Sequence, residues 1–190
     1  MSDYYSEPLN KHLREAKDLA RSAYAVEVNP WVPRGEAEAA IFFRGAIVSA
    51  YGYIETRIGE LTLRISRIPQ YAVLREKMPY HADKRIAFLR EAFSIGELSR
   101  YRGTADRFLL RFEAQADLRH LTAHARMQVM PDWGVTFQDF VTVGHEGPQH
   151  RTRRLPLGDL ELLAWRAARL SRLGQHLMGL LEQTGLLPDL

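Results

Sequence analysis

Three side chains that can take part in proton transfer and phosphate binding lie within six positions of this sequence. They are Arg119, His120 and His124, in the stretch DLRHLTAHARM. Histidine exchanges protons near neutral pH, and arginine can hold a phosphate group or the charge of its transition state. Three interpretations are open for this segment: a zinc site, a solvated helix face, or an arginine–histidine catalytic pair.

The zinc interpretation is the weakest of the three. His120 and His124 are four residues apart, a spacing that lets two imidazoles on one helix share a metal ion. The zinc-protease motif, however, has glutamate directly after its first histidine, and residue 121 is leucine. The spacing of nearby residues indicates no third zinc ligand. His81 and His150, which are distant in the sequence, remain candidates for that ligand. The sequence therefore predicts neither a metal nor another cofactor.

Length and composition set the class of protein. A chain of 190 residues can bury a sizeable core, and we expect a single domain over residues 1–190. The sequence has no cysteine, no apolar run of the roughly 18 residues that a membrane span needs, and no signal-peptide pattern at its start. These features predict a cytoplasmic protein. All but four of its 26 basic residues are arginines, which suits a polyanionic partner, but arginine-rich codon usage explains this bias at least as well.

Apolar residues at helical spacing dominate most of the chain. Residues 1–30 are expected to form an N-terminal helix and loop, and Thr104, Asp159 and Gly185 are the expected caps and stop of later helices. We expect helices over residues 6–24, 36–68, 82–93, 104–125 and 158–184. The long second helix is predicted to bury Ile41, Phe42, Ile47, Tyr51, Ile54, Ile58, Leu61 and Ile65.

The pattern changes between residues 126 and 156. Alternating β-branched and aromatic positions are interrupted by PDWG and GHEG. GHEG, around His145, is interpreted as a turn. Trp133 in PDWG is interpreted as the cap of a hairpin, with contact to the helical bundle or to a partner as the alternative. We expect two or three antiparallel strands, at about 126–130, 135–143 and 149–154. The predicted fold class is mainly α: a helical bundle with a small antiparallel β-hairpin or meander inserted before the last helix.

A helical wheel over residues 104–125 bears on the solvated-face interpretation. It puts Arg119 on a line shared with Phe108 and Phe112, away from the expected core stripe. Two phenylalanines are unusual on a purely solvated face. We therefore expect this second face to meet another helix, in this chain or in a partner subunit. The expected core stripe is Leu110, Ala114, Leu118, Leu121 and Ala125.

The segment RHLTAH resembles the R-(polar)-x-x-x-H motif of the HEPN superfamily, the higher eukaryotes and prokaryotes nucleotide-binding domains. The second position of that motif is commonly Asn, Asp or His, and His120 fits it. AYGYIETRIGELTLRI resembles the earlier helix of bacterial members, which often carries an acidic or polar residue facing the arginine. Glu55 is the best match for that residue and Glu60 the second. The resemblance covers residues 36–125 and the last helix, and it makes the segment 126–156 a lineage-specific insertion.

The resemblance implies a two-fold homodimer whose motif helices face each other, with metal-independent endoribonuclease activity that leaves a 2′,3′-cyclic phosphate. His124 would be the general base or acid, Arg119 the clamp on phosphate and transition state, and His120 an orienting or second polar contact. Glu55 would fix Arg119. An RNA substrate would be bound by a basic rim of four residues, Arg126, Arg151, Arg153 and Arg154. The segment RTRR, which contains the last three, is also typical of a solvated strand end.

Such a protein would act as a toxin or an anti-phage defence effector, with an antitoxin as a partner. Toxins of this family that are controlled by a nucleotidyltransferase antitoxin carry tyrosine two residues after the histidine. This chain has Arg126 there, which puts that kind of antitoxin in doubt. The alternative function is a non-catalytic HEPN-like module that binds a nucleotide, RNA or a protein. The intact Arg–His pair favours the enzyme, and the lack of a separate RNA-reading motif favours the module.

Overall fold

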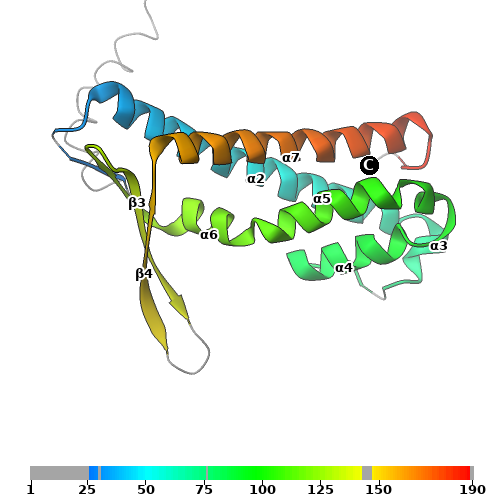
Figure 1. Cartoon of the computed structure of the whole chain (residues 1–190). Helices are drawn as coiled ribbons and strands as arrows, with labels where there is room; N and C mark the ends of the chain where they lie inside the picture. Colours follow the sequence, from blue (N-terminus) through cyan, green and yellow to red (C-terminus); the bar gives the residue numbers. More distant parts are fainter. Residues whose placement is uncertain (1–25, 30, 76, 143–146, 189–190) are drawn as a thin grey trace, which may run out of the picture. The chain divides into compact units, whose positions relative to one another are not determined.

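The structure, a computed structural model, describes residues 26–29, 31–75, 77–142 and 147–188 and is mainly helical (Figure 1). The chain divides into two compact units. The first combines residues up to 45 with residues 120–164, and the second combines 46–119 with the residues from 165 onward. The helix expected over residues 6–24 lies outside the described residues, and the single domain over residues 1–190 stays a prediction.

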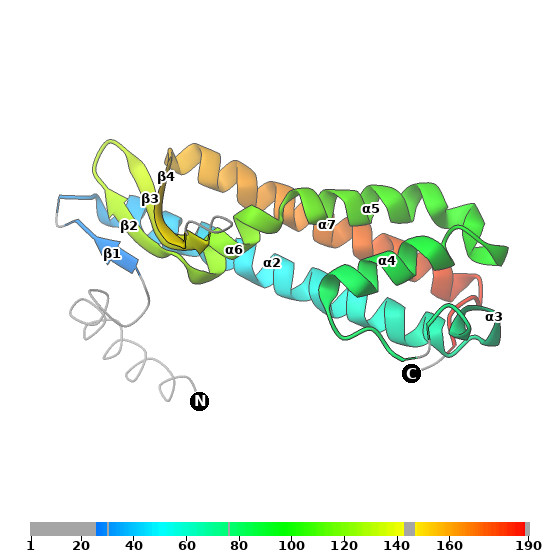
Figure 2. The ribbon, with the colours of Figure 1, turned by 90° about the horizontal axis from the view of Figure 1, so that it is seen from below.

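The first unit contains a four-stranded sheet (Figure 2). Its antiparallel strands β2 (Arg126–Met130), β3 (Gly134–Thr142) and β4 (Pro148–Leu155) confirm the predicted strands to within one or two residues. A fourth strand, β1 (Val26–Val28), was not expected, and it pairs in parallel with β2. The predicted GHEG turn and His145 fall among residues 143–146, outside the described part of the chain.

The PDWG turn between β2 and β3 forms as predicted. Asp132 and Gly134 both have positive φ angles, of 62° and 79°. A Cβ atom on Gly134 would lie 2.5 Å from the carbonyl oxygen of Leu155, so only glycine fits both the backbone conformation and the space. The turn thus holds β3 against the end of β4.

Side chains alternate between the two faces of the sheet. One face is apolar and contributes to the core of the first unit; its buried residues are Met127, Val129, Val135, Phe137 and Leu155. The opposite face is polar. Beyond Gln138 the β3–β4 pair continues without β2 as a two-stranded ribbon, since β2 pairs only with residues 134–138 of β3.

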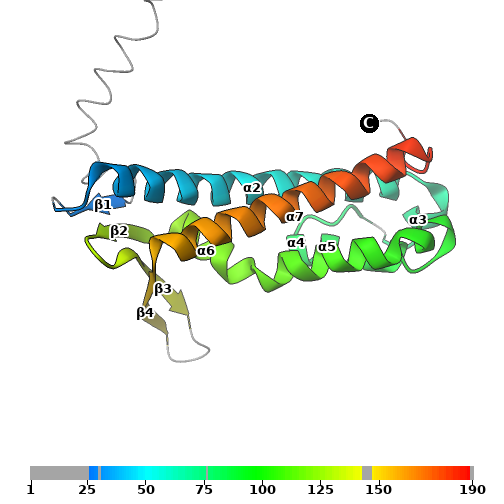
Figure 3. The ribbon, with the colours of Figure 1, turned by 45° about the horizontal axis from the view of Figure 1, so that its top comes forward.

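The second unit is helical (Figure 3). The long helix α2 (Arg34–Ser66) and the last helix α7 (Leu157–Gln183) each contribute to both units. The other helices of the second unit are α3 (Pro69–Ala72), α4 (Ala82–Ala92), the 3₁₀ helix η1 (Gly96–Tyr101) and α5 (Arg102–Ala114). The helices α3 and η1 were not expected. No helix in the described ranges is long and apolar enough to cross a membrane.

The apolar stripe of α2 is confirmed over most of its length. The predicted residues from Ile47 to Ile65 are buried in the second unit. The prediction is wrong for Ile41 and Phe42 in the first turns, which are 45% and 68% exposed. Helical spacing alone cannot tell where along a long helix the neighbouring elements stop covering it.

The predicted helix over residues 104–125 is wrong as one continuous element. It begins earlier, at Arg102, so Thr104 lies inside the helix, and it breaks at Gln115 before α6 (Ala116–His124). In α5 the buried face carries Phe108 and Phe112, whereas Leu110 is 62% exposed. The C-terminal half of the predicted stripe is confirmed, since Leu118, Leu121 and Ala125 are buried. The break shifts the apolar face of α6 around the helix axis relative to that of α5, so a single helical wheel cannot describe both helices.

The two phenylalanines therefore require no partner subunit. Phe108 packs against the backbone of α7 at Gly174, where a Cβ atom would lie 2.7 Å from the ring. Phe112 contacts Tyr51 of α2, with ring centroids 6.5 Å apart. Both packing partners belong to the second unit of the same chain.

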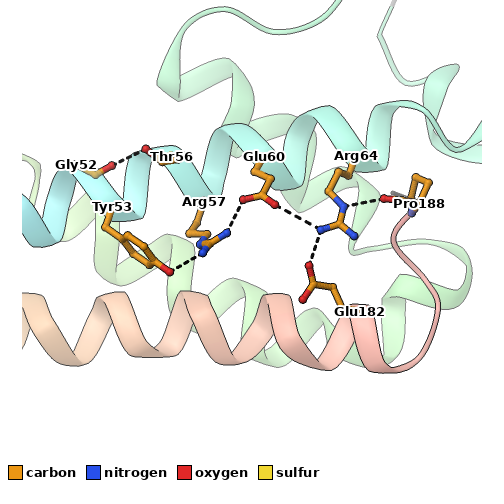
Figure 4. Close-up of polar contacts among 8 residues, drawn as sticks. All are labelled: Gly52, Tyr53, Thr56, Arg57, Glu60, Arg64, Glu182 and Pro188. Atoms are coloured by element: carbon orange, nitrogen blue, oxygen red, sulfur yellow. Dashed lines mark hydrogen bonds and ion pairs between the residues drawn. The ribbon is translucent and has the colours of Figure 1, made fainter. Parts of the chain in front are cut away.

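Arg64 joins α2 to the end of α7 in the second unit (Figure 4). Its Nη1 lies 2.6 Å from Glu182 Oε1, and its Nε donates to the carbonyl of Pro188 at 2.8 Å. Helix α7 starts at Leu157, so Asp159 lies in the first turn and is not the expected cap. The predicted stop is confirmed, because Gly185, two residues after the last residue of the helix, has a φ of 68°.

We predict that Gly134→Ala destabilises the protein more than Gly147→Ala. Both glycines have positive φ, and that conformation costs an L-residue roughly 1–2 kcal/mol. Gly134 adds a backbone clash, whereas no atom of the described residues lies within 4 Å of a Cβ atom on Gly147. Thermal unfolding should show a fall in Tm several degrees larger for Gly134→Ala. Equal melting temperatures for the two variants would contradict the close packing of this turn.

Candidate functional site

The C-terminal end of α6, which carries His124, is fixed by Arg44 of α2. The guanidinium donates from Nε to the carbonyl of Thr122 at 2.8 Å and from Nη2 to the carbonyl of Ala125 at 2.9 Å. The last carbonyls of a helix have no partner within the helix and carry its negative dipole end, so a cation is well suited to bind them. Partial burial lowers the pKa of Arg44.

His120 and His124 lie side by side on α6 in the first unit. Their ring centroids are 5.0 Å apart, and both residues are exposed. His120 Nε2 lies 3.9 Å from Oδ2 of Asp139 on β3, an ion pair when the imidazole is protonated. Two imidazole rings are thus exposed to solvent, and one of them lies beside a carboxylate.

Asp139 is held on the other side by Arg151 of β4. The two residues are directly opposite in the β3–β4 register, and Arg151 donates to both carboxylate oxygens, at 2.9 and 2.6 Å. The hydrogen bond from Arg151 lowers the pKa of Asp139, with help from the charges of Arg151, His120 and His150 and against the effect of burial. Arg151, Asp139 and His120 therefore form a polar chain in the first unit.

In the second unit, Arg119 makes the predicted contact with Glu55. Its Nη1 is paired with Oε1 of Glu55 on α2, and both side chains are partly exposed. Glu60, the second match, instead pairs with Arg57 and Arg64 of its own helix (Figure 4). Glu55 is thus the carboxylate that faces Arg119, as the resemblance implied.

A cleft of about 220 Å³ lies beside this ion pair, and Glu55 and Arg119 line it. Arg85 of α4 adds a second guanidinium, and exposed Tyr80 adds an aromatic ring. Ala82 at the start of α4 also lines the cleft, and the side chain of the N-cap residue His81 makes no capping hydrogen bond to that helix. Two arginines and a positive helix end make the cleft suited to an anion.

The break before α6 is held by Tyr51, which donates its hydroxyl proton to Oε1 of Gln115. Burial raises the pKa of Tyr51 to about 12, although the nearby charge of Arg119 acts in the opposite direction. The phenol therefore stays neutral at physiological pH and remains a hydrogen-bond donor to Gln115.

The four arginines of the predicted basic rim do not share one surface. Arg151 points to the apolar side of the sheet and binds Asp139. Arg153 lies on that same side, in register with Phe137, whereas Arg126 and Arg154 lie on the polar face. The rim is thus divided between the two faces of the sheet.

Among the described residues, no group of three or more histidine, aspartate or glutamate side chains is arranged to hold a metal ion. Arg44, Asp139 and Arg85 were not among the site residues predicted from the sequence. A signal existed for Asp139, because a correct hairpin register pairs it with Arg151. Neither Arg44 nor Arg85 belongs to a motif, and only the fold brings them to their partners. In comparisons with protein-family models, with curated proteins and with solved structures, nothing matches this chain.

We predict that Arg44→Lys lowers the free energy of unfolding by about 1.5–3 kcal/mol, the range for hydrogen bonds to a charged group. A lysine has no planar fork to donate to two carbonyls of α6 at once. The matched control is Arg34→Lys on the same helix, where the side chain is 81% exposed and forms an ion pair with Glu38. Urea unfolding should leave the control near wild type. A loss of the same size in both variants would contradict the helix-end role of Arg44.

Asp139→Asn should lower the free energy of unfolding by about 1–3 kcal/mol at neutral pH, because it removes the carboxylate that binds Arg151. The pKa of Asp139 is depressed in the folded protein, so its contribution is present above the unfolded pKa and is lost as pH falls through the folded value. Urea unfolding from pH 7 downward should therefore show wild type and variant converging in acid. Asp106→Asn, which breaks the exposed Arg102–Asp106 pair, should have little effect at any pH.

Proposed function

We propose that this protein is a metal-independent endoribonuclease of the HEPN type. The observation that carries the proposal is the Arg119–Glu55 pair, because it joins the arginine of the motif to the acidic residue that the resemblance places opposite it. Exposed His120 and His124 on the same helix supply the titratable groups that cleavage needs. RNA carries its own nucleophile, the 2′-hydroxyl, and so requires no metal for this reaction.

In the proposed reaction His124 accepts the proton of the 2′-hydroxyl or donates a proton to the 5′-oxygen that leaves. The 2′-oxygen attacks phosphorus, the bond from phosphorus to the 5′-oxygen breaks, and the products are a 2′,3′-cyclic phosphate and a 5′-hydroxyl. His120, which lies beside Asp139, would be the second polar contact and a partner for the complementary proton transfer.

Arg119 would hold the scissile phosphate and its transition-state charge. Glu55 fixes the guanidinium from one side, and the neighbouring cleft adds Arg85 and the N-terminus of α4. Helix α6 separates residues 119 and 124 by about 7.5 Å along its axis. Their side chains leave the helix at directions about 140° apart.

This divergence supports a two-fold dimer as part of the proposal. If two α6 helices faced each other, Arg119 of one copy would approach His124 of the other, as the resemblance implies. A C2 contact would build two equal sites in this way. The roles of toxin or anti-phage effector, and the antitoxin partner, rest on the resemblance alone.

A non-catalytic binding module is the second candidate, and one observation favours it. Glu55 already neutralises Arg119, so part of the attraction of that guanidinium for phosphate is lost. In such a module the cleft would bind an anionic ligand and His124 would have no chemical role.

The test is incubation of the purified protein with total RNA in EDTA, with analysis of fragment lengths and ends. Wild type should cleave and leave 2′,3′-cyclic phosphate ends. His124→Ala should reduce the rate by about 100-fold or more, the usual size of a general acid–base contribution, and Arg119→Ala by a comparable factor. Glu55→Gln should reduce the rate less, since Arg119 remains but is no longer fixed.

Matched controls separate the chemistry from a general loss of charge. His176→Ala and Arg111→Ala remove an exposed histidine of α7 and an exposed arginine of α5, and both should cleave like wild type. Absence of cleavage by wild type, or equal rates in all variants, would leave the binding module as the better function.

A further inference from the structure

The polar face of the sheet in the first unit is a second candidate binding surface, separate from the residues of α6. In the strand register Gln128, Thr136 and Arg154 form one row across β2, β3 and β4, and Arg126, Gln138 and Thr152 form the next. We call this surface, with Met130, Trp133, Phe140 and His150, the polar face. It contains a hollow of about 320 Å³; the residues lining it are Gln128, Met130, Trp133, Thr136, Gln138, Thr152 and Arg154.

An exposed aromatic ring lies at each end of the polar face. Trp133, in the β2–β3 turn, is 62% exposed, and the guanidinium carbon of Arg154 lies 5.3 Å from the centre of its ring. Phe140 is 72% exposed in the two-stranded ribbon and packs edge-on against His150 at 5.5 Å. Trp133 belongs to a tight turn and Phe140 to a paired strand. Exposed aromatic rings of this kind are platforms on which unpaired bases stack.

The floor between the two rings is cationic and rich in hydrogen-bonding groups. Arg126 and Arg154 are exposed on it, and amides and hydroxyls come from Gln128, Gln138 and Thr152. None of the described residues that line the hollow is acidic. The carboxylate of Asp139 belongs to the opposite side of the sheet, where Arg151 binds it. Charge on the polar face therefore complements an anion.

The ligand that matches both properties has flat rings and a negatively charged backbone. A peptide with an apolar stripe does not match a floor of glutamine, threonine and arginine. A duplex keeps its bases paired and stacked, so they are not available to Trp133 and Phe140. We infer that the polar face binds single-stranded RNA, with bases stacked on the two rings and phosphates near Arg126 and Arg154. The choice of RNA over DNA rests on the proposed function, whereas binding of a single strand does not.

Binding is measured by fluorescence anisotropy with a labelled 12-nucleotide uridine RNA in EDTA. All proteins carry His124→Ala, so that cleavage cannot change the readout. Trp133→Ala and Phe140→Ala should each weaken the Kd by about fivefold or more, the lower limit for loss of one stacked base. Arg154→Gln should weaken binding and make the dependence of log K on log salt shallower by about 0.7, the loss of one phosphate contact on a single strand.

The chain offers close controls. Arg153→Gln removes the neighbouring charge on the other side of β4, and Trp165→Ala removes an exposed tryptophan of α7 outside the sheet. Both should bind like the parent protein, and unchanged melting temperatures should show that every variant is folded. Equal loss of affinity in Arg153→Gln and Arg154→Gln would overturn the assignment of the face.

The remaining outcomes are also decisive. Full binding by the Trp133→Ala/Phe140→Ala double variant, or preference for a duplex of the same length, would overturn single-strand binding. Equal affinity for the matching DNA strand would overturn the assignment to RNA. Because the parent protein lacks His124, absence of ribonuclease activity in the wild type would contradict the proposed function without changing these binding results.

Discussion

The bond between Arg44 and the last carbonyls of α6 is the interaction on which the histidine geometry depends. Helix α6 has nine residues, and a helix of that length is unstable on its own in water. In the first unit the guanidinium fixes its final turn through the carbonyls of Thr122 and Ala125. His124 lies between these two residues in the chain, so the same bonds fix the backbone that carries it. β2 begins directly afterwards, at Arg126.

The break at Gln115 could not be predicted from the sequence, whereas the pairing of Arg119 with Glu55 could. RFEAQADLRH contains no glycine or proline, and each half has good helical spacing, so nothing local indicates a break. The residue that hydrogen-bonds Gln115 at the break is Tyr51, which lies on another helix and 64 residues earlier in the chain. The pairing of Glu55 with Arg119 was still predictable, because it depended on two motifs and not on a continuous wheel.

The strands and their turns were predictable because alternation and turn residues are local properties. β1 was not, since three residues carry too little pattern and its partner β2 lies about a hundred residues away. Asp139 is an intermediate case. The hairpin register determines which residue faces Arg151, but an error of one position moves the carboxylate to the opposite face. Arg44 had no signal at all, because its partners are backbone atoms 78 and 81 residues further along the chain.

The β-hairpin is more than an addition to a helical core. Its inner side carries Asp139, which lies beside His120 and is itself held by Arg151. Its outer side carries two exposed aromatic rings and two arginines around a polar floor. Neighbouring arginines in RTRR thus have different surroundings because alternate residues of a strand face opposite ways. An arginine-rich segment that composition alone would assign to one solvated strand end therefore contains one residue that binds Asp139 and another whose guanidinium lies over the ring of Trp133.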